Sequence, residues 1–410
     1  MKNNKFLKSF AILASGTLLA QLVTALSSPV MTRLFSTTEI GQYTYILSII
    51  NLFYPVVALR YDYMIVPEKK DSRVFALLKL SFSLLIFFSV VIGIGYFAFN
   101  FNKDNVIVIS VMLVLMMISN GFVDIIGNYN NKYGQYKLMS STYAFRSIVQ
   151  NILMIIAGFL HLGIIGLIAS QLIGSFAGLS RQSKDIITRR KDIWEVGLDE
   201  VKNVAVKYKA QALLSTPAIF MNSFSYNALN FAISFAFGNS ILGLYSLSYR
   251  ILGMPVTLIS GNLSKVYFEE AANEYKETGC FKKSFNTIVK YTLPIAVCVL
   301  LGLVVLAPMV FSIVFGSNWR GAGVMAQILA PMFSIRIVAN TLGPSIWITQ
   351  KQKYDVIFQV LLVLGLGITV VSKFLLDITV YEFLGVYCIS NSMVYLYSIY
   401  VHYQLSRGKI

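Results

Sequence analysis

Long runs of uncharged, apolar residues alternate with short polar and basic stretches along the whole chain. Four of these runs reach the length of about 20 residues that a helix needs to cross ~30 Å of hydrocarbon. They extend from Ser9 to Thr32, Leu80 to Asn102, Asn105 to Val123 and Phe383 to Ser406. Two longer runs, residues 147–180 and 210–249, are interrupted at His161-Leu162-Gly163 and Gly238-Asn239-Ser240. Each of the longer runs therefore predicts a helical hairpin.

With the more interrupted segments added, the pattern predicts an all-α integral membrane protein of about twelve transmembrane helices. The first span begins with basic residues as a signal peptide does, but its length favours a retained helix. The predicted spans are residues 9–32, 40–66, 75–99, 105–127, 139–160, 163–183, 210–237, 241–264, 285–315, 322–349, 355–372 and 381–404.

Composition and charge support a membrane protein. Only 13% of the 410 residues are charged, against roughly 25% in soluble globular domains, which excludes an ordinary cytosolic enzyme. A net charge of +16 would suggest a nucleic-acid partner for a soluble protein. Here the cations lie between apolar runs, so no nucleic acid is expected.

The cations also predict the topology. Twenty-four Lys and Arg residues fall in alternate connections, and four fall on the opposite side: Arg33, Lys103, Arg320 and Lys373. Because positive loops stay in the cytoplasm, both termini are predicted to be cytoplasmic. We expect a multi-pass protein of the cytoplasmic (inner) cell membrane.

The sequence contains no motif for redox, metal or ATP-dependent chemistry. Three cysteines and two histidines are too few and too scattered for a disulfide framework or a metal site. No phosphate-binding Gly-x-x-x-x-Gly-Lys-Ser/Thr loop is present, so an ATP-driven pump is disfavoured. We therefore expect no cofactor and no catalytic residue, and a proton or sodium gradient as the candidate driving force.

With Arg181, at the end of the sixth span, counted in the connection that follows, six cations fall within predicted spans: Arg60, Lys79, Arg146, Arg250, Lys290 and Arg336. The two lysines lie about one turn from cytoplasmic helix ends, where they can snorkel to the interface. Each arginine would cost ~2.5 to 3.5 kcal/mol facing lipid, so all four are expected to face an interior cavity. Guanidinium groups suit phosphate, and the arginines are therefore predicted to bind an anionic substrate.

Two acids and one polar stripe complete the set of candidate site residues. Asp62 and Asp124 are the only embedded acids, and they could pair with Arg60 and Arg146; Asp124 is also a candidate ion-coupling residue. The seventh span carries Asn222, Tyr226 and Asn230 at helical spacing. Such side chains either hold helices together or line a path for sugar hydroxyls, and the sequence leaves both interpretations open.

The long basic connection in the middle divides the chain into an N-terminal six-helix lobe (1–183), a cytoplasmic linker (184–209) and a C-terminal six-helix lobe (210–410). The linker is either a solvated segment or an interfacial helix in the headgroup layer. Ile40-Gly41-Gln42-Tyr43 and Leu242-Gly243-Leu244-Tyr245 open corresponding helices, and Pro55 and Pro255 follow them. These similarities between the two halves favour two parallel repeats with pseudo-two-fold symmetry, as in transporters.

Several N-terminal motifs resemble those of a known family, the Wzx-type flippases of O-antigen and capsule repeat units, within the superfamily that also holds the multidrug exporters. The motifs are Ala14-Ser15-Gly16-Thr17, Ser28-Pro29-Val30-Met31-Thr32-Arg33-Leu34-Phe35, Ile40-Gly41-Gln42-Tyr43 and Leu59-Arg60-Tyr61-Asp62 before Lys69-Lys70. The helix number and the six-plus-six layout extend the resemblance over the whole chain.

The resemblance implies a V-shaped pair of lobes that alternates between inward-open and outward-open states around a cationic central cavity. It implies an oligosaccharide repeat unit on undecaprenyl pyrophosphate as the cargo, with membrane lipids and other polysaccharide-assembly proteins as candidate partners. Arg60, Arg146, Arg250 and Arg336 would bind the pyrophosphate and acidic sugars. Arg33, Lys79 and Lys290, with the polar stripe of the seventh span, are candidate cavity-lining residues.

The main alternative is a gradient-driven multidrug or other amphiphile exporter of the same fold. Such an exporter needs embedded carboxylates for cationic drugs, whereas embedded arginines outnumber embedded acids here. A lipid II flippase would usually carry more than twelve helices, and a membrane polymerase or ligase would carry a large external loop. A flippase without covalent catalysis fits the sequence better than any of these.

Overall fold

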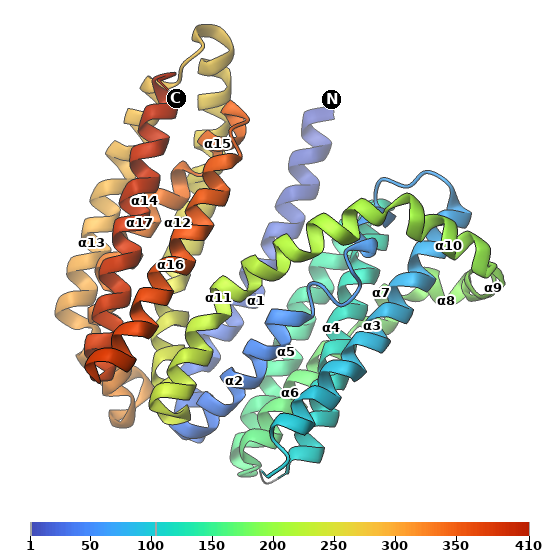
Figure 1. Cartoon of the computed structure of the whole chain (residues 1–410), viewed down its shortest axis with the longest axis horizontal. Helices are drawn as coiled ribbons and strands as arrows, with labels where there is room; N and C mark the ends of the chain where they lie inside the picture. The colour runs from blue at the N-terminus through green and yellow to red at the C-terminus, as the bar shows by residue number, and fades with distance from the viewer. Residues whose placement is uncertain (1, 103–104, 410) are drawn as a thin grey trace. The chain divides into compact units, whose positions relative to one another are not determined.

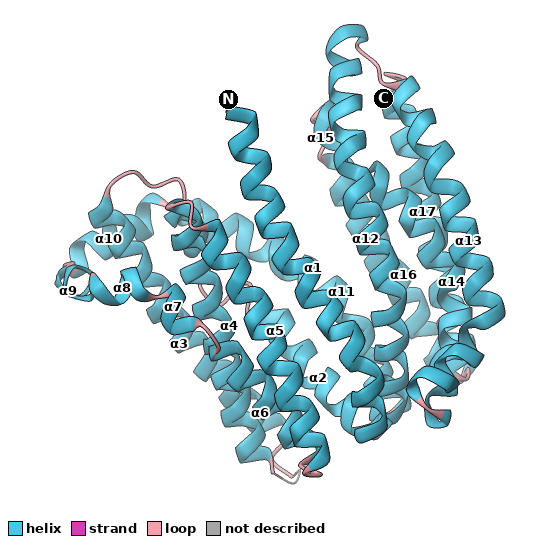
Figure 2. Ribbon diagram, turned by 180° about the vertical axis from the view of Figure 1, so that it is seen from behind, coloured by secondary structure: helices cyan, strands magenta, loops and turns pink. Residues whose placement is uncertain are grey.

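The computed structural model describes residues 2–102 and 105–409, with side chains from Ser15 onward, and this part of the chain contains helices and connections but no strand. It divides into two compact units, Met1–Asn227 and Ala228–Ile410. Each unit is a bundle of helices that run side by side (Figure 1 and Figure 2).

The first unit is built around two helix pairs, in which α1 packs on α5 and α3 packs on α4. A capping box starts α2, because the Ser36 hydroxyl accepts from the amide of Glu39 while the Glu39 carboxylate accepts from the amide of Ser36. The helices are α1 (Lys2–Leu34), α2 (Thr37–Phe53), η1 (Tyr61–Ile65), α3 (Asp71–Phe99), α4 (Val106–Lys132), α5 (Tyr136–Phe159), α6 (Gly163–Phe176), α7 (Leu179–Gln182), α8 (Lys184–Thr188), α9 (Arg190–Glu195), α10 (Leu198–Lys207), η2 (Gln211–Ser215) and α11 (Thr216–Phe237), which continues into the second unit.

The second unit is organised around α14, which contacts α12, α13 and α17. In the segment Ser317–Thr349, which contains α14, 67% of an 18-residue apolar window is buried within the protein, whereas only 11% of the corresponding window of α13 is buried. A side chain at Gly323 would lie 2.5 Å from the Pro308 backbone, so this glycine allows α13 and α14 to pack closely. The helices are α12 (Asn239–Thr278), α13 (Lys282–Phe315), η3 (Ser317–Trp319), α14 (Arg320–Leu342), α15 (Pro344–Thr349), α16 (Lys353–Leu376) and α17 (Val380–Ser406).

Helical structure occurs in each of the twelve predicted spans. Among the described residues, nine helical segments are long and apolar enough to cross a membrane. The other three predicted spans contain α1, α2 and α11; α2 has only 17 residues, and asparagines make α11 more polar. The all-helical membrane fold is confirmed, and the count of twelve spans stays a prediction.

The span predicted as one helix over residues 40–66 is wrong in its second half. The α-helix ends at Phe53, and residues 54–60 form turns before η1 begins at Tyr61. Pro55 has no amide hydrogen to continue the helix. Leu59 and Arg60 have φ values of +48° and +62°, a left-handed conformation that costs on the order of 1 kcal/mol per non-glycine residue. Arg60 therefore lies at a break in the helix.

Three other predicted boundaries also differ from the structure. The span 163–183 breaks at Gly178, where φ is +74° and α7 begins. The span 322–349 breaks at Gly343, because Pro344 starts a new helix, α15. The helix predicted for 241–264 instead continues to Thr278, since no glycine or proline interrupts residues 262–278.

The predicted linker residues 184–209 form α8, α9 and α10, which lie in the first unit at one end of α3 (Figure 1). The boundary between the compact units falls instead within α11, between Asn227 and Ala228. The predicted lobes, 1–183 and 210–410, stay a prediction. The predicted external cation Lys103 and the side chains of Lys2, Lys5 and Lys8 lie outside the described residues, and the sidedness of the termini stays a prediction.

Candidate functional site

The break after α2 opens a small polar cavity inside the first unit. It has a volume of about 80 Å³, and its lining includes Arg60, Asp62 and Asp124 together with the tyrosines Tyr54 and Tyr63. The guanidinium carbon of Arg60 lies 3.4 Å from the centre of the Tyr63 ring, as a cation–π contact requires. The helix break thus places an arginine and two acids around one cavity.

The two predicted pairs of arginine and acid are neighbours rather than direct ion pairs. Neither pair is among the ion pairs within 4 Å that join described residues. The Asp62 carboxylate instead accepts a hydrogen bond of 2.9 Å from the Asn128 amide. Asp124 interacts electrostatically with Asp62 and with both Arg60 and Arg146. The four charged groups therefore form one cluster, which we call the unit 1 cluster.

Arg146 is bound within the protein. Its Nη2 donates to Oε1 of Gln182 at 2.9 Å, and its Nε donates to the carbonyl oxygen of Ala177 at 3.2 Å. Ala177 is the C-terminal cap of α6, and a cation is favourable at a helix C-terminus. The side chain is buried, although Nη1 has no hydrogen-bond partner among the described residues. Arg146 therefore fixes the end of α6 with part of its guanidinium group.

Arg336 lies in a different environment in the second unit, on α14. Its Nη1 donates to the Tyr249 hydroxyl at 3.1 Å, and its guanidinium carbon lies 5.7 Å from the Phe333 ring and 5.9 Å from the Tyr395 ring. The Tyr249 and Phe333 rings meet edge to face, with centroids 5.2 Å apart. Arg336 and these three rings form what we call the unit 2 cluster, and Arg250 follows Tyr249 on α12, half-buried.

The structure distributes the remaining predicted site residues over several places. Arg33 and Lys290 are exposed. On α11, Asn222 is half-buried and Tyr226 is exposed in the first unit, while Asn230 is half-buried in the second. Asn227, next to the predicted stripe, donates to the Ser223 carbonyl at 2.8 Å within the same helix.

Lys79 binds the linker helices. Its ammonium group donates to the backbone oxygens of Val196 at 2.8 Å and Trp194 at 3.3 Å. These carbonyls lie at the C-terminal end of α9, where a cation stabilises the helix. The side chain is thus occupied in holding the linker, an arrangement that sequence periodicity did not reveal.

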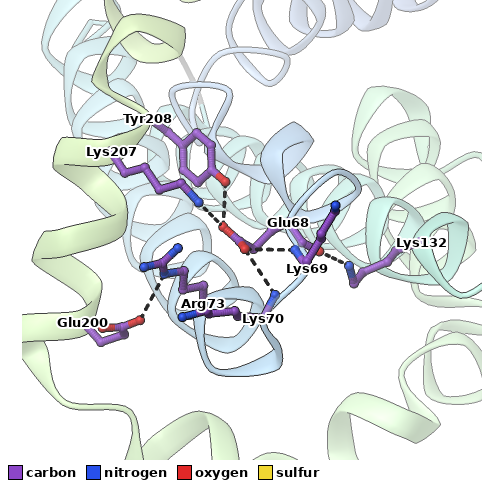
Figure 3. A network of polar contacts seen from close by, with 8 residues as sticks. All are labelled: Glu68, Lys69, Lys70, Arg73, Lys132, Glu200, Lys207 and Tyr208. Atoms are coloured by element: carbon purple, nitrogen blue, oxygen red, sulfur yellow. Dashed lines mark hydrogen bonds and ion pairs between the residues drawn. The ribbon is translucent and has the colours of Figure 1, made fainter.

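A second polar network, centred on Glu68, was missed by the sequence analysis (Figure 3). The Glu68 carboxylate accepts from Lys207 at 2.5 Å and from the Tyr208 hydroxyl at 2.6 Å. It also accepts from the amides of Lys69 and Lys70 at 2.9 and 3.2 Å. Lys132 donates to the Glu68 carbonyl oxygen. The one available signal in the sequence was the acidic residue Glu68 directly before two lysines, in a connection that was interpreted only for its positive charge.

The network keeps Glu68 ionised. Its side chain is only 4% exposed, and this burial alone would raise its pKa. The hydrogen bonds from Lys207, Tyr208 and the two backbone amides outweigh burial and lower the pKa of Glu68 to about 2. Conversely, the hydrogen bond to Glu68 raises the pKa of Lys207. Glu68 therefore joins the α2–α3 connection, the end of α4 and the end of the linker.

The chain is similar in sequence to proteins of polysaccharide biosynthesis. The family model for polysaccharide biosynthesis proteins matches residues 30–324 of the chain. A stretch of 135 residues is 28% identical to the teichuronic acid biosynthesis protein TuaB of Bacillus subtilis (strain 168). That match spans 32% of this chain and 28% of TuaB, so it covers well under half of either protein.

Solved structures share the fold over nearly the whole chain. An inward-facing multidrug resistance transporter of the MATE family and MOP superfamily is 13% identical with a TM-score of 0.70, covering 95% of this chain and 94% of that one. The lipid II flippase MurJ in an inward closed conformation is 16% identical with a TM-score of 0.69, covering 96% and 90%. At such identities the likeness shows the fold alone. With the apolar helices, it makes the chain a multi-pass membrane protein. The family match over residues 30–324, together with this fold, confirms the resemblance drawn from the sequence.

Proposed function

The chain belongs to the polysaccharide biosynthesis protein family, and from this membership we propose that it is a flippase for lipid-linked oligosaccharides. Its cargo is an oligosaccharide repeat unit on undecaprenyl pyrophosphate, moved across the cytoplasmic membrane by alternating access for a surface polymer such as O-antigen or capsule. The observation that carries the proposal is the family match over residues 30–324. The fold is equally similar to an exporter and to a flippase, so it does not favour either.

The embedded arginines provide the binding chemistry that this cargo needs. A diphosphate crossing hydrocarbon must exchange its water for other hydrogen-bond donors, and guanidinium groups bind phosphate oxygens in a bidentate manner. Arg336 and Arg250 of the second unit are the principal diphosphate ligands in this proposal, with Arg60 and Arg146 of the first unit in a supporting role. No covalent step is needed, because the cargo leaves unchanged.

Sugar rings would be bound by aromatic and amide side chains. The rings of Tyr249, Phe333 and Tyr395 around Arg336 offer flat apolar faces next to a cation, a combination suited to a sugar phosphate. Asn222, Tyr226 and Asn230 on α11 carry amide and hydroxyl groups that can bind sugar hydroxyls.

The unit 1 cluster is the candidate for coupling to an ion gradient. Asp124 and Asp62 share one small cavity with Arg60, and a carboxylate near a second carboxylate and an arginine changes its proton affinity when either neighbour moves. A proton, or a sodium ion, that binds at Asp124 would therefore bias one state of the cycle.

Deletion of the gene in its host tests the proposal. We expect undecaprenyl pyrophosphate carrying complete repeat units to accumulate in extracted lipids, measured by mass spectrometry, while surface polysaccharide is lost. The wild-type gene should reverse both changes, and the mass of the intermediate would identify the glycan. Unchanged lipid intermediates together with altered drug sensitivity would contradict the flippase and support the exporter.

A further inference from the structure

The linker helices α8 to α10 present two apolar surfaces. One is covered, because Ile193 and Val204 are buried where α9 and α10 contact α3. The other is bare: the side chains of Trp194 and Leu198 are 76% and 78% exposed. Neighbouring large apolar residues so exposed are costly in water, which raises the question of what covers them.

The position of Lys79 shows how deep this bare surface lies. The 20 residues from Leu80 to Phe99 alone extend ~30 Å at 1.5 Å per helical residue, which is the thickness of the hydrocarbon core. Lys79 therefore lies at the edge of the hydrocarbon. Because its ammonium group is hydrogen-bonded to the carbonyls of Trp194 and Val196, the end of α9 lies at the level of the lipid headgroups.

Three further contacts hold the linker at that level. Arg73, near the start of α3, lies 3.6 Å from Glu200. The Tyr61 hydroxyl donates to the carbonyl oxygen of Ala205 at 3.1 Å, and Glu68 binds Lys207 at the end of α10 (Figure 3). Lys79 and Arg73 belong to α3, one of the membrane-spanning candidates, while Tyr61 and Glu68 lie just before it in the chain. A segment attached at these four points cannot move away from the bilayer as a free linker would.

We propose that the linker is an interfacial element whose Trp194 and Leu198 side chains insert into the cytoplasmic leaflet at the level of the phospholipid headgroups. The amphipathic indole ring suits this region, and short helices with one apolar face lie in it. Arg190 and Lys191, both exposed on α9, reach the lipid phosphates from there. Lys79 is the positioning residue that sets the depth. The inference does not depend on which cargo is transported.

Fluorescence quenching in lipid vesicles tests the insertion. The chain has three tryptophans, so the difference between the wild-type protein and Trp194→Phe isolates the emission of Trp194. We expect this emission to be quenched strongly by phosphatidylcholine brominated near the headgroup, less by phosphatidylcholine brominated near the chain ends, and little by aqueous iodide. Quenching by iodide alone would overturn the proposal in favour of a solvated linker. Protection from all three quenchers would overturn it in favour of a protein contact.

A pair of lysine variants tests the role of Lys79. Lys79→Gln should shift the emission of Trp194 towards iodide quenching and away from lipid quenching. The matched control is Lys290→Gln, another lysine near a predicted cytoplasmic helix end, whose exposed side chain lies on α13 in the second unit. It should leave the profile unchanged. An unaltered profile in Lys79→Gln would contradict the positioning role.

Discussion

The embedded arginines lie in different environments in the two units. In the first unit, Arg60 lies beside Asp62 and Asp124 in one cavity, and Arg146 binds the end of α6. In the second unit, Arg336 is surrounded by the rings of Tyr249, Phe333 and Tyr395, and α14 itself carries no acidic residue. An arginine near acids is partly neutralised, whereas an arginine among rings keeps its charge for an anion. We infer different tasks: charge compensation and coupling in the first unit, and anion binding in the second.

The largest effect should follow Arg336→Ala. Losing a charged, bidentate donor costs ~1.5 to 3 kcal/mol, so we expect export of surface polymer to fall roughly tenfold or more while membrane insertion stays normal. Arg336→Lys keeps the charge but not the planar guanidinium group, so its export should lie between that of the wild type and that of Arg336→Ala. Polymer measured on whole cells and protein measured in membranes provide the comparison. Normal export by both Arg336→Ala and Arg250→Ala would remove the arginines from the anion site.

A smaller effect is expected for Arg60→Ala, because its charge is compensated locally. The sharper test is a double-mutant cycle with Asp124→Asn, scored by the same export measurement. If the two groups act as one cluster, the double variant should lose less than the two single losses combined, with a coupling of roughly 0.5 to 3 kcal/mol. Strict additivity would show that they work independently.

Glu68→Gln should lower stability more than it lowers export. The pKa of Glu68 falls from 4.5 to about 2 on folding, so the ionised carboxylate stabilises the protein above about pH 4.5 and this stabilisation is lost as the pH falls towards 2. We expect the variant to lose ~1.5 to 3 kcal/mol at neutral pH. Thermal unfolding of the purified protein checks this, and the difference in stability between variant and wild type should disappear as the pH falls towards 2. A stability difference that does not change with pH would show that it does not arise from the ionised carboxylate.

The smallest effect on export is expected for Lys79→Gln. Lys79 binds the carbonyl oxygens of Trp194 and Val196 in the linker rather than either arginine cluster, and substitutions of such partly exposed side chains typically change stability by no more than about 0.5 kcal/mol. Export within about twofold of wild type should accompany the changed depth of Trp194. A loss as severe as that of Arg336→Ala would mean that Lys79 acts on the cargo.

Hydrophobic run length predicted the helices well, because crossing a bilayer demands long apolar segments whatever the tertiary packing. The breaks were harder to predict. Pro55 gave a visible signal, but the left-handed backbone at Leu59 and Arg60 depends on tertiary contacts. The embedded arginines were found from their cost in lipid. The hydrogen-bond partners of the cluster could not be predicted, because they are distant in sequence: Gln182 and Ala177 bind Arg146, and Asn128 binds Asp62. The network of Glu68 was missed for the same reason.

The most direct test of the central claim is flipping by the purified protein. Vesicles containing an isolated lipid-linked oligosaccharide would be prepared with the wild-type protein, with Arg336→Ala, or without protein, and an impermeant glycan-modifying reagent would report the fraction of glycan facing outward over time. We predict that wild-type protein makes nearly all of the glycan accessible, while Arg336→Ala resembles protein-free vesicles. Equal accessibility in all three preparations would contradict the assignment as a lipid-linked oligosaccharide flippase.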